Sequence, residues 1–242
     1  MEGGGWRVEG GEWRVEGGGW WVVGGGWWVG LGGAFFVGVG RMILEGLVTT
    51  LGPGRRINMA PMGPVVNPDL TEFLLRPFQT STTFRNLKHH PQGVLHVVDD
   101  VLLLAQGAVG RLGPPFPTVR PAAVIDGVVL QDACRCYEFE VEQFDERQPR
   151  AEIRVRVLHA ESLRDFWGFN RAKHAVIEAA ILATRLHLTG VEPVLSEYER
   201  LRVTVEKTAG PREQEAFDLL WAYVSAGGQL PEEDADDPAP EV

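Results

Sequence analysis

The distribution of hydrophobic and polar residues divides the chain between residues 42 and 228 into two parts. Up to about residue 162, apolar residues form short runs or alternate with polar ones, as they do in β-strands. Beyond that point they recur about every 3.6 residues, as they do in amphipathic helices. We therefore predict an α+β protein in which a β-rich domain (42–162) precedes a helical subdomain (163–228).

Six segments of the first part have the pattern of strands. The second of them contains Pro61 and Pro64, which place it at a sheet edge or at a bulge. The last two alternate on either side of the sequence DERQPR, and this predicts a hairpin. On its solvent face, three glutamates are expected to pair with two arginines: Glu138, Glu140 and Glu142 with Arg154 and Arg156. The six segments are 43–51, 56–66, 72–78, 93–98, 135–144 and 151–159.

Polar residues mark the expected starts of helices. Hydroxyl residues at positions 80–83 precede a short helix, and Asp99 is expected to cap a helix over residues 101–109. Residues 111–127, with four prolines, are expected to form a loop. Three longer helices are predicted over residues 170–188, 193–206 and 211–226.

The composition of the chain is uneven, and this sets its first 41 residues apart. Residues 1–40 hold 16 of the 30 glycines and six of the eight tryptophans, with tryptophan at positions 6, 13, 20 and 27. The glycines exclude a coiled coil despite this seven-residue period. We interpret residues 1–41 as a disordered low-complexity leader. A membrane span over residues 20–40 is a weaker alternative, because eight of these 21 residues are glycine.

The net charge of −10 is also localised. The acidic tail, residues 229–242, carries six acids and no base, whereas residues 41–230 carry 21 basic and 23 acidic residues. The sequence has no concentration of basic residues that would predict a nucleic-acid partner, and no membrane partner is expected. The two cysteines, Cys134 and Cys136, are too few for a disulfide framework, so we expect a cytoplasmic protein.

The best local candidate for a binding site runs from Arg76 to Asn86. Arg76 lies in a predicted strand, four hydroxyl residues follow at positions 80–83, and a helix then begins. The free N–H groups and the dipole of that helix start favour an anion, and Arg76 or Arg85 could form a forked contact with a phosphate. The same pattern also fits a capped helix with surface arginines.

A second candidate lies at the start of the helix over residues 170–188. Three aromatic residues precede Arg171, Lys173 and His174, and Glu178 stands one helical turn after His174, where it could orient that ring. An ordinary helix start is the alternative. No further ligands stand at a suggestive spacing, so no metal site is predicted.

Two motifs carry a resemblance to a known superfamily. The segment Asn58-Met59-Ala60-Pro61-Met62-Gly63-Pro64 is followed by a hydrophobic strand and then by Ser81-Thr82-Thr83-Phe84-Arg85-Asn86. This arrangement resembles the FMN-binding split-barrel superfamily of flavin reductases and pyridoxamine-phosphate-oxidase-like proteins. Residues 42–225 as a whole resemble an uncharacterised family within it, the domain of unknown function four-four-seven. The resemblance implies a six-stranded Greek-key split β-barrel that forms a homodimer, with FMN at the dimer interface.

The resemblance also implies roles for particular residues. Thr83 and Asn86 match the turn at the flavin phosphate, with Ser81 and Thr82 beside them, and the backbone of the strand holding Asn58, Ala60, Pro61 and Met62 lines the isoalloxazine. Ser81 replaces the lysine of the family, so the positive charge must come from Arg76 or Arg85.

The activity implied is that of an FMN-dependent oxidoreductase acting on a small molecule, for which a pterin-type compound is a candidate. Catalytic candidates are Arg171, Lys173 and His174. The alternative is a non-catalytic module that binds flavin or another cofactor and keeps the barrel fold.

Overall fold

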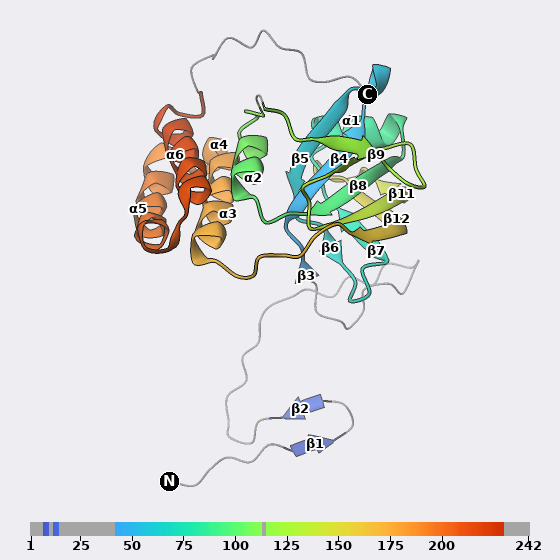
Figure 1. Ribbon diagram of the computed structural model, residues 1–242, viewed down its shortest axis with the longest axis horizontal. Helices are drawn as coiled ribbons and strands as arrows, with labels where there is room; N and C mark the ends of the chain where they lie inside the picture. Colours follow the sequence, from blue (N-terminus) through green and yellow to red (C-terminus); the bar gives the residue numbers. More distant parts are fainter. Residues whose placement is uncertain (1–6, 10–11, 15–41, 113–114, 230–242) are drawn as a thin grey trace. The chain divides into compact units, whose positions relative to one another are not determined.

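The computed structural model describes residues 7–9, 12–14, 42–112 and 115–229 (Figure 1). The chain divides into two compact units, residues 1–39 and 40–242. In the first unit, β1 (Arg7–Glu9) and β2 (Glu12–Arg14) pair in antiparallel register. The rest of the leader and the tail after residue 229 lie outside the described residues, so their predicted character stays a prediction.

The strands between residues 42 and 162 form one antiparallel sheet with a Greek-key order. Neighbouring strands run β3-β6-β7-β12-β11-β8-β4-β5. The pairs β7–β12 and β8–β4 join strands that are distant in the sequence. The strands are β3 (Met42–Ile43), β4 (Gly46–Leu51), β5 (Ile57–Met62), β6 (Val65–Val66), β7 (Glu72–Leu75), β8 (Gln92–Val97), β11 (Arg135–Asp145) and β12 (Glu152–Ser162).

Two of the six expected strand segments bend and contribute to both ends of this sheet. Residues 44–45 separate β3 from β4, and residues 63–64 separate β5 from β6. One end of the sheet is the pair β3–β6 and the other is the pair β4–β5. The sheet therefore curls on itself, and six segments give eight strands. The predicted split barrel is confirmed, with Pro61 on an edge strand and Pro64 at a bend, as proline chemistry requires.

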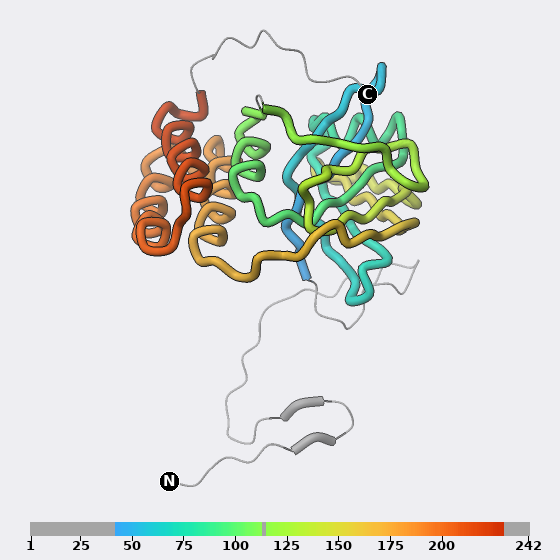
Figure 2. The backbone as a smooth tube through the Cα atoms, in the orientation of Figure 1, coloured from blue at the N-terminus to red at the C-terminus, as the bar shows by residue number. Residues whose placement is uncertain are grey.

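The helices gather beside the barrel, except for α1 (Thr82–His89), which contacts β4 and β5 (Figure 1). Figure 2 shows the chain leaving the barrel after β12 and entering the helical part. α2 lies in the sequence of the β-rich domain but packs against α3 and α6. The remaining helices are α2 (Val101–Ala108), α3 (Arg171–Thr184), α4 (Leu186–Thr189), α5 (Val191–Thr208) and α6 (Pro211–Ser225).

The segment expected to be a loop, residues 111–127, contains a strand. β9 (Val119–Pro121) pairs with β10 (Val128–Leu130) to form a separate two-stranded sheet. A three-residue strand that ends in a proline is too short to show an alternating pattern, so it could not be predicted. A short 3₁₀ turn (Pro53–Arg55) connects β4 to β5.

Three clusters of buried hydrophobic residues hold the described part of the chain together, and two of them are large. The barrel core includes Phe73, Leu95 and Phe139, all almost fully buried. The second core joins α2, α3, α5 and α6 to one side of the barrel. Within it, Tyr198 packs on Phe217, and its hydroxyl donates a hydrogen bond of 2.7 Å to the carbonyl of Ala179.

His96 connects three strands inside the barrel. It is fully buried, its Nδ1 lies 3.2 Å from the carbonyl oxygen of Leu47, and the N–H of Leu130 donates to its Nε2 at 3.1 Å. Nε2 must therefore be the unprotonated nitrogen, and Nδ1 donates. Burial lowers the pKa of His96 to about 4, with the bond to Leu47 opposing the change.

In the hairpin of β11 and β12, the prediction that Glu138 pairs with an arginine on the solvent face is wrong. Glu138 is fully buried, and its carboxylate accepts hydrogen bonds from the N–H groups of Ala123 (2.7 Å) and Val124 (2.8 Å). Both faces of β11 are covered at this point, by the barrel core on the side of Phe139 and by the segment 122–129 on the side of Glu138. The other expected ion pairs form between Arg156 and the glutamates at positions 140 and 142.

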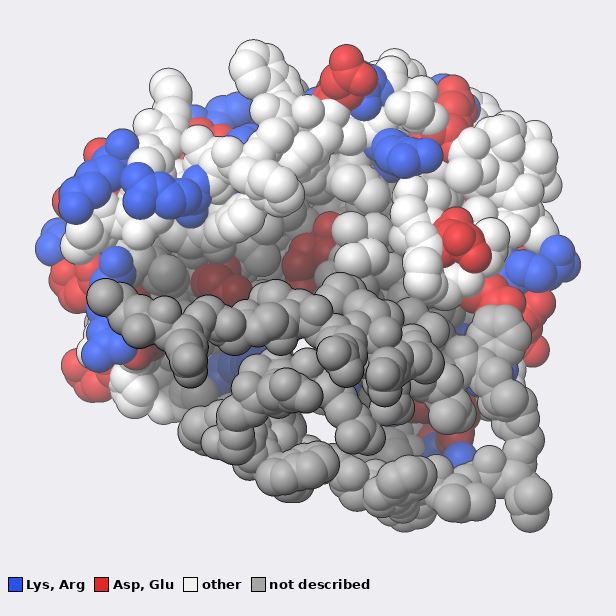
Figure 3. All heavy atoms as spheres, turned by 90° about the horizontal axis from the view of Figure 1, so that it is seen from below, with Lys and Arg blue, Asp and Glu red and all other residues white. Residues whose placement is uncertain are grey.

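Charged side chains of both signs lie on the face shown in Figure 3. Lys and Arg gather mainly over the helical side, and acidic side chains lie in the hollow between that side and the barrel. The described part of this face therefore carries both positive and negative charges. The absence of a nucleic-acid partner stays a prediction.

Candidate functional site

The first candidate region is the start of α1. Ser81 is its N-cap, and its Oγ accepts a hydrogen bond of 3.2 Å from the N–H of Phe84, as the sequence predicted. Thr82 and Arg85 are exposed, and Arg85 donates from Nη2 to the Thr82 hydroxyl at 3.2 Å. This helix start therefore presents a hydroxyl and a guanidinium to solvent.

Three of the predicted site residues meet in a network behind this helix start. Thr83 and Asn86 are buried and face the barrel. Asn58 on β5 donates to the hydroxyls of Thr83 (3.1 Å) and Thr50 (3.3 Å), and Asn86 donates to Thr50 at 3.1 Å. The network fixes the position of α1 on β4 and β5. Thr50 was not predicted, and its only signal was a hydroxyl residue within an apolar strand.

A cluster of arginines lies next to the turn that leads into α1. Arg150 donates from Nε to the carbonyl of Arg76 at 3.2 Å, and its guanidinium stacks 4.8 Å from the ring centroid of Phe78. Partial loss of hydration, followed by the positive charges of Arg76 and Arg185, lowers the pKa of Arg150. Among the described residues, neither Arg76 nor Arg150 forms an ion pair with a carboxylate.

Sequence reasoning missed Arg150, because it lies 74 residues from Arg76. The two come together through the isolated bridge between Phe78 and Arg150. The carbonyl of Phe78 also accepts the N–H of Ser81 at 2.9 Å, which links the arginine cluster to the start of α1. Two guanidiniums that pair with no carboxylate in the described ranges, beside a helix N-terminus and a hydroxyl, form a good environment for a phosphate.

The predicted ring-binding strand lies at an end of the sheet. Ala60, Pro61 and Met62 are half-buried residues of β5, which pairs with β4 alone in the described residues. Pro61 packs under α2, where a Cβ at Gly107 would lie 2.9 Å from the proline ring. The other backbone edge of β5 offers hydrogen-bonding groups of the kind that a flat polar ring needs at its rim.

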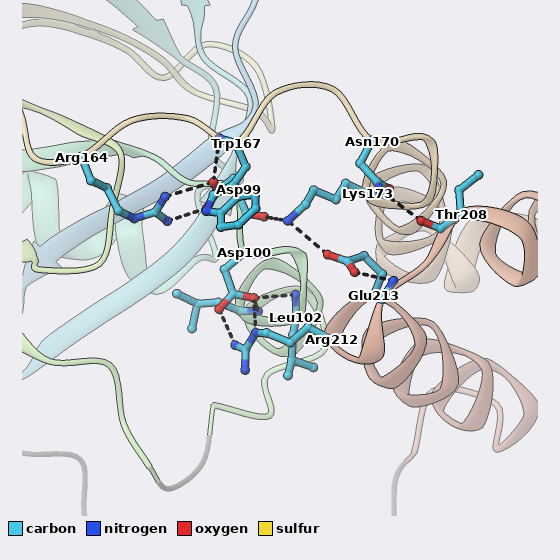
Figure 4. A network of polar contacts seen from close by, with 12 residues as sticks. Asp99, Asp100, Leu102, Arg164, Trp167, Asn170, Lys173, Thr208, Arg212 and Glu213 are labelled. Carbon is cyan, nitrogen blue, oxygen red and sulfur yellow. Dashed lines mark hydrogen bonds and ion pairs between the residues drawn. The ribbon is translucent and has the colours of Figure 1, made fainter.

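The second candidate region is a network of charges where α2, α3 and α6 begin (Figure 4). Asp99 accepts hydrogen bonds from both Nη atoms of Arg164 and from the N–H of Trp167 at 3.2 Å. The hydrogen bonds from Arg164, and more weakly the other bonds and charges around it, lower the pKa of Asp99 to about 2 despite its burial. Its backbone carbonyl accepts a hydrogen bond from Lys173.

The prediction that Asp99 caps α2 is wrong. Asp100 is the N-cap, and it accepts from the N–H groups of Leu102 (3.1 Å) and Leu103 (3.4 Å). Two adjacent acids both suit a cap in sequence, and the choice depends on Arg164, which is 65 residues away. Arg212 on α6 pairs with the capping carboxylate.

The three catalytic candidates do not converge on one point. Lys173 forms an ion pair of 3.1 Å with Glu213 and bonds to Asp99, whereas Arg171 and His174 are exposed. The ring of His174 meets that of Phe169 edge to face at 5.8 Å. No hydrogen bond or ion pair joins His174 to Glu178 among the described residues.

Glu178 instead lies near enough to a carboxylate of the barrel to affect its pKa. Burial, and then the negative charge of Glu178, raise the pKa of Glu45 on the bend between β3 and β4. Lys173 is thus part of the structure that joins the barrel to the helices, and the partner expected for His174 lies near another carboxylate.

The curled Greek-key sheet and the C-terminal helices define a flavin-reductase-like split-barrel protein. The chain belongs to the family described as Protein of unknown function (DUF447): the model of its N-terminal domain matches residues 44–164, and a second DUF447 model matches residues 170–221. The predicted family is confirmed. No curated protein matches the chain.

Several solved structures are similar to this chain. The FMN-bound protein MM1853 from Methanosarcina mazei is 24% identical and has a TM-score of 0.65, covering 76% of this chain and 96% of its own. The 2-nitrobenzoate 2-nitroreductase NbaA from Pseudomonas fluorescens is 18% identical, with a TM-score of 0.43, covering 51% of this chain and 66% of its own. An FMN-binding protein from Thermus thermophilus is 13% identical, with a TM-score of 0.42, covering 57% and 80%. None of the helices in the described part of this chain has the length and apolar character needed to cross a bilayer.

Proposed function

We propose that this protein binds FMN and uses it as an oxidoreductase acting on a small molecule. The observation that carries the proposal is the pair Arg76 and Arg150, which lies beside the start of α1 with no carboxylate partner among the described residues. A phosphate group would neutralise both. The shared fold with the FMN-bound relative from Methanosarcina mazei supports the same conclusion.

The residues present fit the two ends of this cofactor. Arg76, Arg150, Arg85 and the Thr82 hydroxyl would hold the phosphate, together with the N–H groups at the start of α1. The network of buried side chains would position that helix. The free edge of β5, over residues 60–62, would donate and accept hydrogen bonds at the rim of the ring. FMN supplies hydride or electron transfer when bound, and the chain binds and orients it.

A non-catalytic flavin-binding module is the second candidate. It is favoured by the dispersion of the predicted catalytic residues, since Lys173 is held by Glu213 and Asp99 while Arg171 and His174 face solvent. In this case the chain would carry or sense flavin without turning over a substrate.

We also infer a cytoplasmic homodimer. Cys134 and Cys136 are both free and buried, which suits a reducing compartment. Met42 and Ile43 of the edge strand β3 are half exposed, and a second copy of the chain packed against them would bury their apolar surface. A pterin-type substrate remains a prediction from the resemblance.

The visible spectrum of the purified protein tests the proposal. We expect a yellow protein, or one that turns yellow and quenches flavin fluorescence on incubation with FMN. Anaerobic bleaching by NADH or NADPH would then support the oxidoreductase over the binding module, and a yellow protein that neither nucleotide bleaches would support the module. A colourless protein that does not take up FMN contradicts both.

A further inference from the structure

We propose that the crevice at the start of α2, α3 and α6 is a second ligand site, which takes a planar aromatic molecule bearing an anionic group. The crevice has a volume of about 550 Å³, within the range of small-molecule sites. Its walls combine exposed aromatic rings with cations that are more exposed than their acidic partners. Its lining includes Asp99, Arg164, Trp167, Phe169, Arg212 and Glu213.

The aromatic wall is a loop whose backbone is fixed while its rings stay exposed. Trp167 is 87% exposed and Phe169 is 92% exposed. The N–H of Trp167 donates to Asp99, and Gly168 has a φ of 98°, a conformation that other residues rarely adopt. At the end of the loop, Asn170 donates to the carbonyl of Thr208 at 3.0 Å. The loop thus holds two large rings at the crevice without burying them, as a stacking surface requires.

The charged wall presents its cations outward. In each of its three ion pairs the basic side chain is more exposed than its acidic partner: Arg164 at 35% against Asp99 at 5%, Lys173 at 21% against Glu213 at 12%, and Arg212 at 60% against Asp100 at 29%. The cations of the crevice are therefore more accessible to a ligand than the carboxylates.

Arg212 is the group best placed to bind the anion. Its Nε and Nη2 are directed to Asp100, and its Nη1 makes no hydrogen bond within the described part of the chain. A carboxylate or phosphate on the ligand could accept from this nitrogen, with the ring lying against Trp167. The crevice therefore selects a ring and an anion together.

This crevice lies apart from the site that we assign to FMN. Figure 1 shows α1 at one end of the barrel, whereas the segment that enters α3 runs past the opposite end. None of Arg76, Thr82, Arg85 or Arg150 lines the crevice. We therefore expect a ligand to bind here independently of FMN.

Equilibrium dialysis with 2-naphthoate as probe tests the proposal on the full chain, free of flavin and then saturated with FMN. We expect 2-naphthoate to bind about tenfold more tightly than either 2-naphthalenemethanol, which lacks the charge, or cyclohexanecarboxylate, which lacks the aromatic ring. We expect Trp167→Ala and Arg212→Gln each to weaken its binding about tenfold. FMN at saturation should leave the affinity unchanged.

Matched variants distinguish loss of the site from loss of the fold. Leu188→Ala removes an apolar side chain that is 72% exposed on α4, and Arg200→Gln removes an exposed charge on α5, so both should bind like the wild type. Equal binding of the three probes, or equal affinities in all four variants, would overturn the proposal. Displacement of 2-naphthoate by FMN would overturn it too, because the crevice would then be the flavin site. Since the flavin-free assay needs no FMN, failure of the flavin proposal would be seen separately.

Discussion

Replacing Asp99 by alanine is expected to lower the free energy of unfolding by about 3 kcal/mol. The carboxylate is buried and accepts from Arg164 and from the N–H of Trp167, while the backbone of the same residue binds Lys173. Its loss leaves a guanidinium without its main partner and frees the loop that leads into α3. Denaturant unfolding at pH 7 measures the difference.

The matched control for Asp99→Ala is Arg156→Ala. Arg156 also forms two ion pairs, with Glu140 and Glu142, but its side chain is half exposed. Water replaces such contacts at little cost, so we expect a change below about 1 kcal/mol. Equal losses in the two variants would show that the network at Asp99 does not connect the barrel to the helices.

Acidification is expected to destabilise the protein through His96. The pKa of His96 is about 4 in the folded protein against an ordinary value of 6.5. Between pH 4 and pH 6.5 the imidazole is therefore protonated in the unfolded chain and neutral in the folded one. The stability present above pH 6.5 is thus lost as the pH falls towards 4, by about 3 kcal/mol in total. Denaturant unfolding at several pH values between 4 and 7.5 measures this loss.

The variant His96→Leu isolates this contribution from that of the carboxylates. It should be less stable than the wild type at pH 7.5, because the Leu47 carbonyl and the Leu130 N–H lose their partner. Its stability should fall less between pH 6.5 and 4. His89→Gln, at an exposed position of α1, should keep the wild-type slope. A slope that His96→Leu leaves intact would contradict the assignment.

The sequence predicted the elements well where one physical pattern decided them. Strand alternation, the Ser81 cap and the helical period are local properties, and each predicted its element to within a few residues. The prolines correctly indicated an edge position, because β5 lies at the end of the sheet. The resemblance also grouped Asn58, Thr83 and Asn86, and one network joins them: Asn58 donates to Thr83, and both asparagines donate to Thr50.

The errors arose where a distant partner decides the outcome. Asp99 rather than Asp100 turns inward because Arg164 meets it there, and Glu138 is buried because the segment 122–129 covers its face of the sheet and donates two N–H groups to it. Arg150 reaches Arg76 only through the fold of the hairpin. A local sequence pattern does not show which distant residues will be in contact, so Arg150 could not be predicted as a site residue.

The comparison of FMN with riboflavin, which lacks the phosphate, tests the central claim most directly. Fluorescence titration of the flavin-free protein should give FMN an advantage of about 100-fold over riboflavin, because two guanidiniums meet the phosphate. In the double variant Arg76→Gln, Arg150→Gln this advantage should collapse while riboflavin binding stays the same. The double variant Arg200→Gln, Arg202→Gln on α5 should keep it. An FMN advantage that survives the loss of Arg76 and Arg150 would contradict the account.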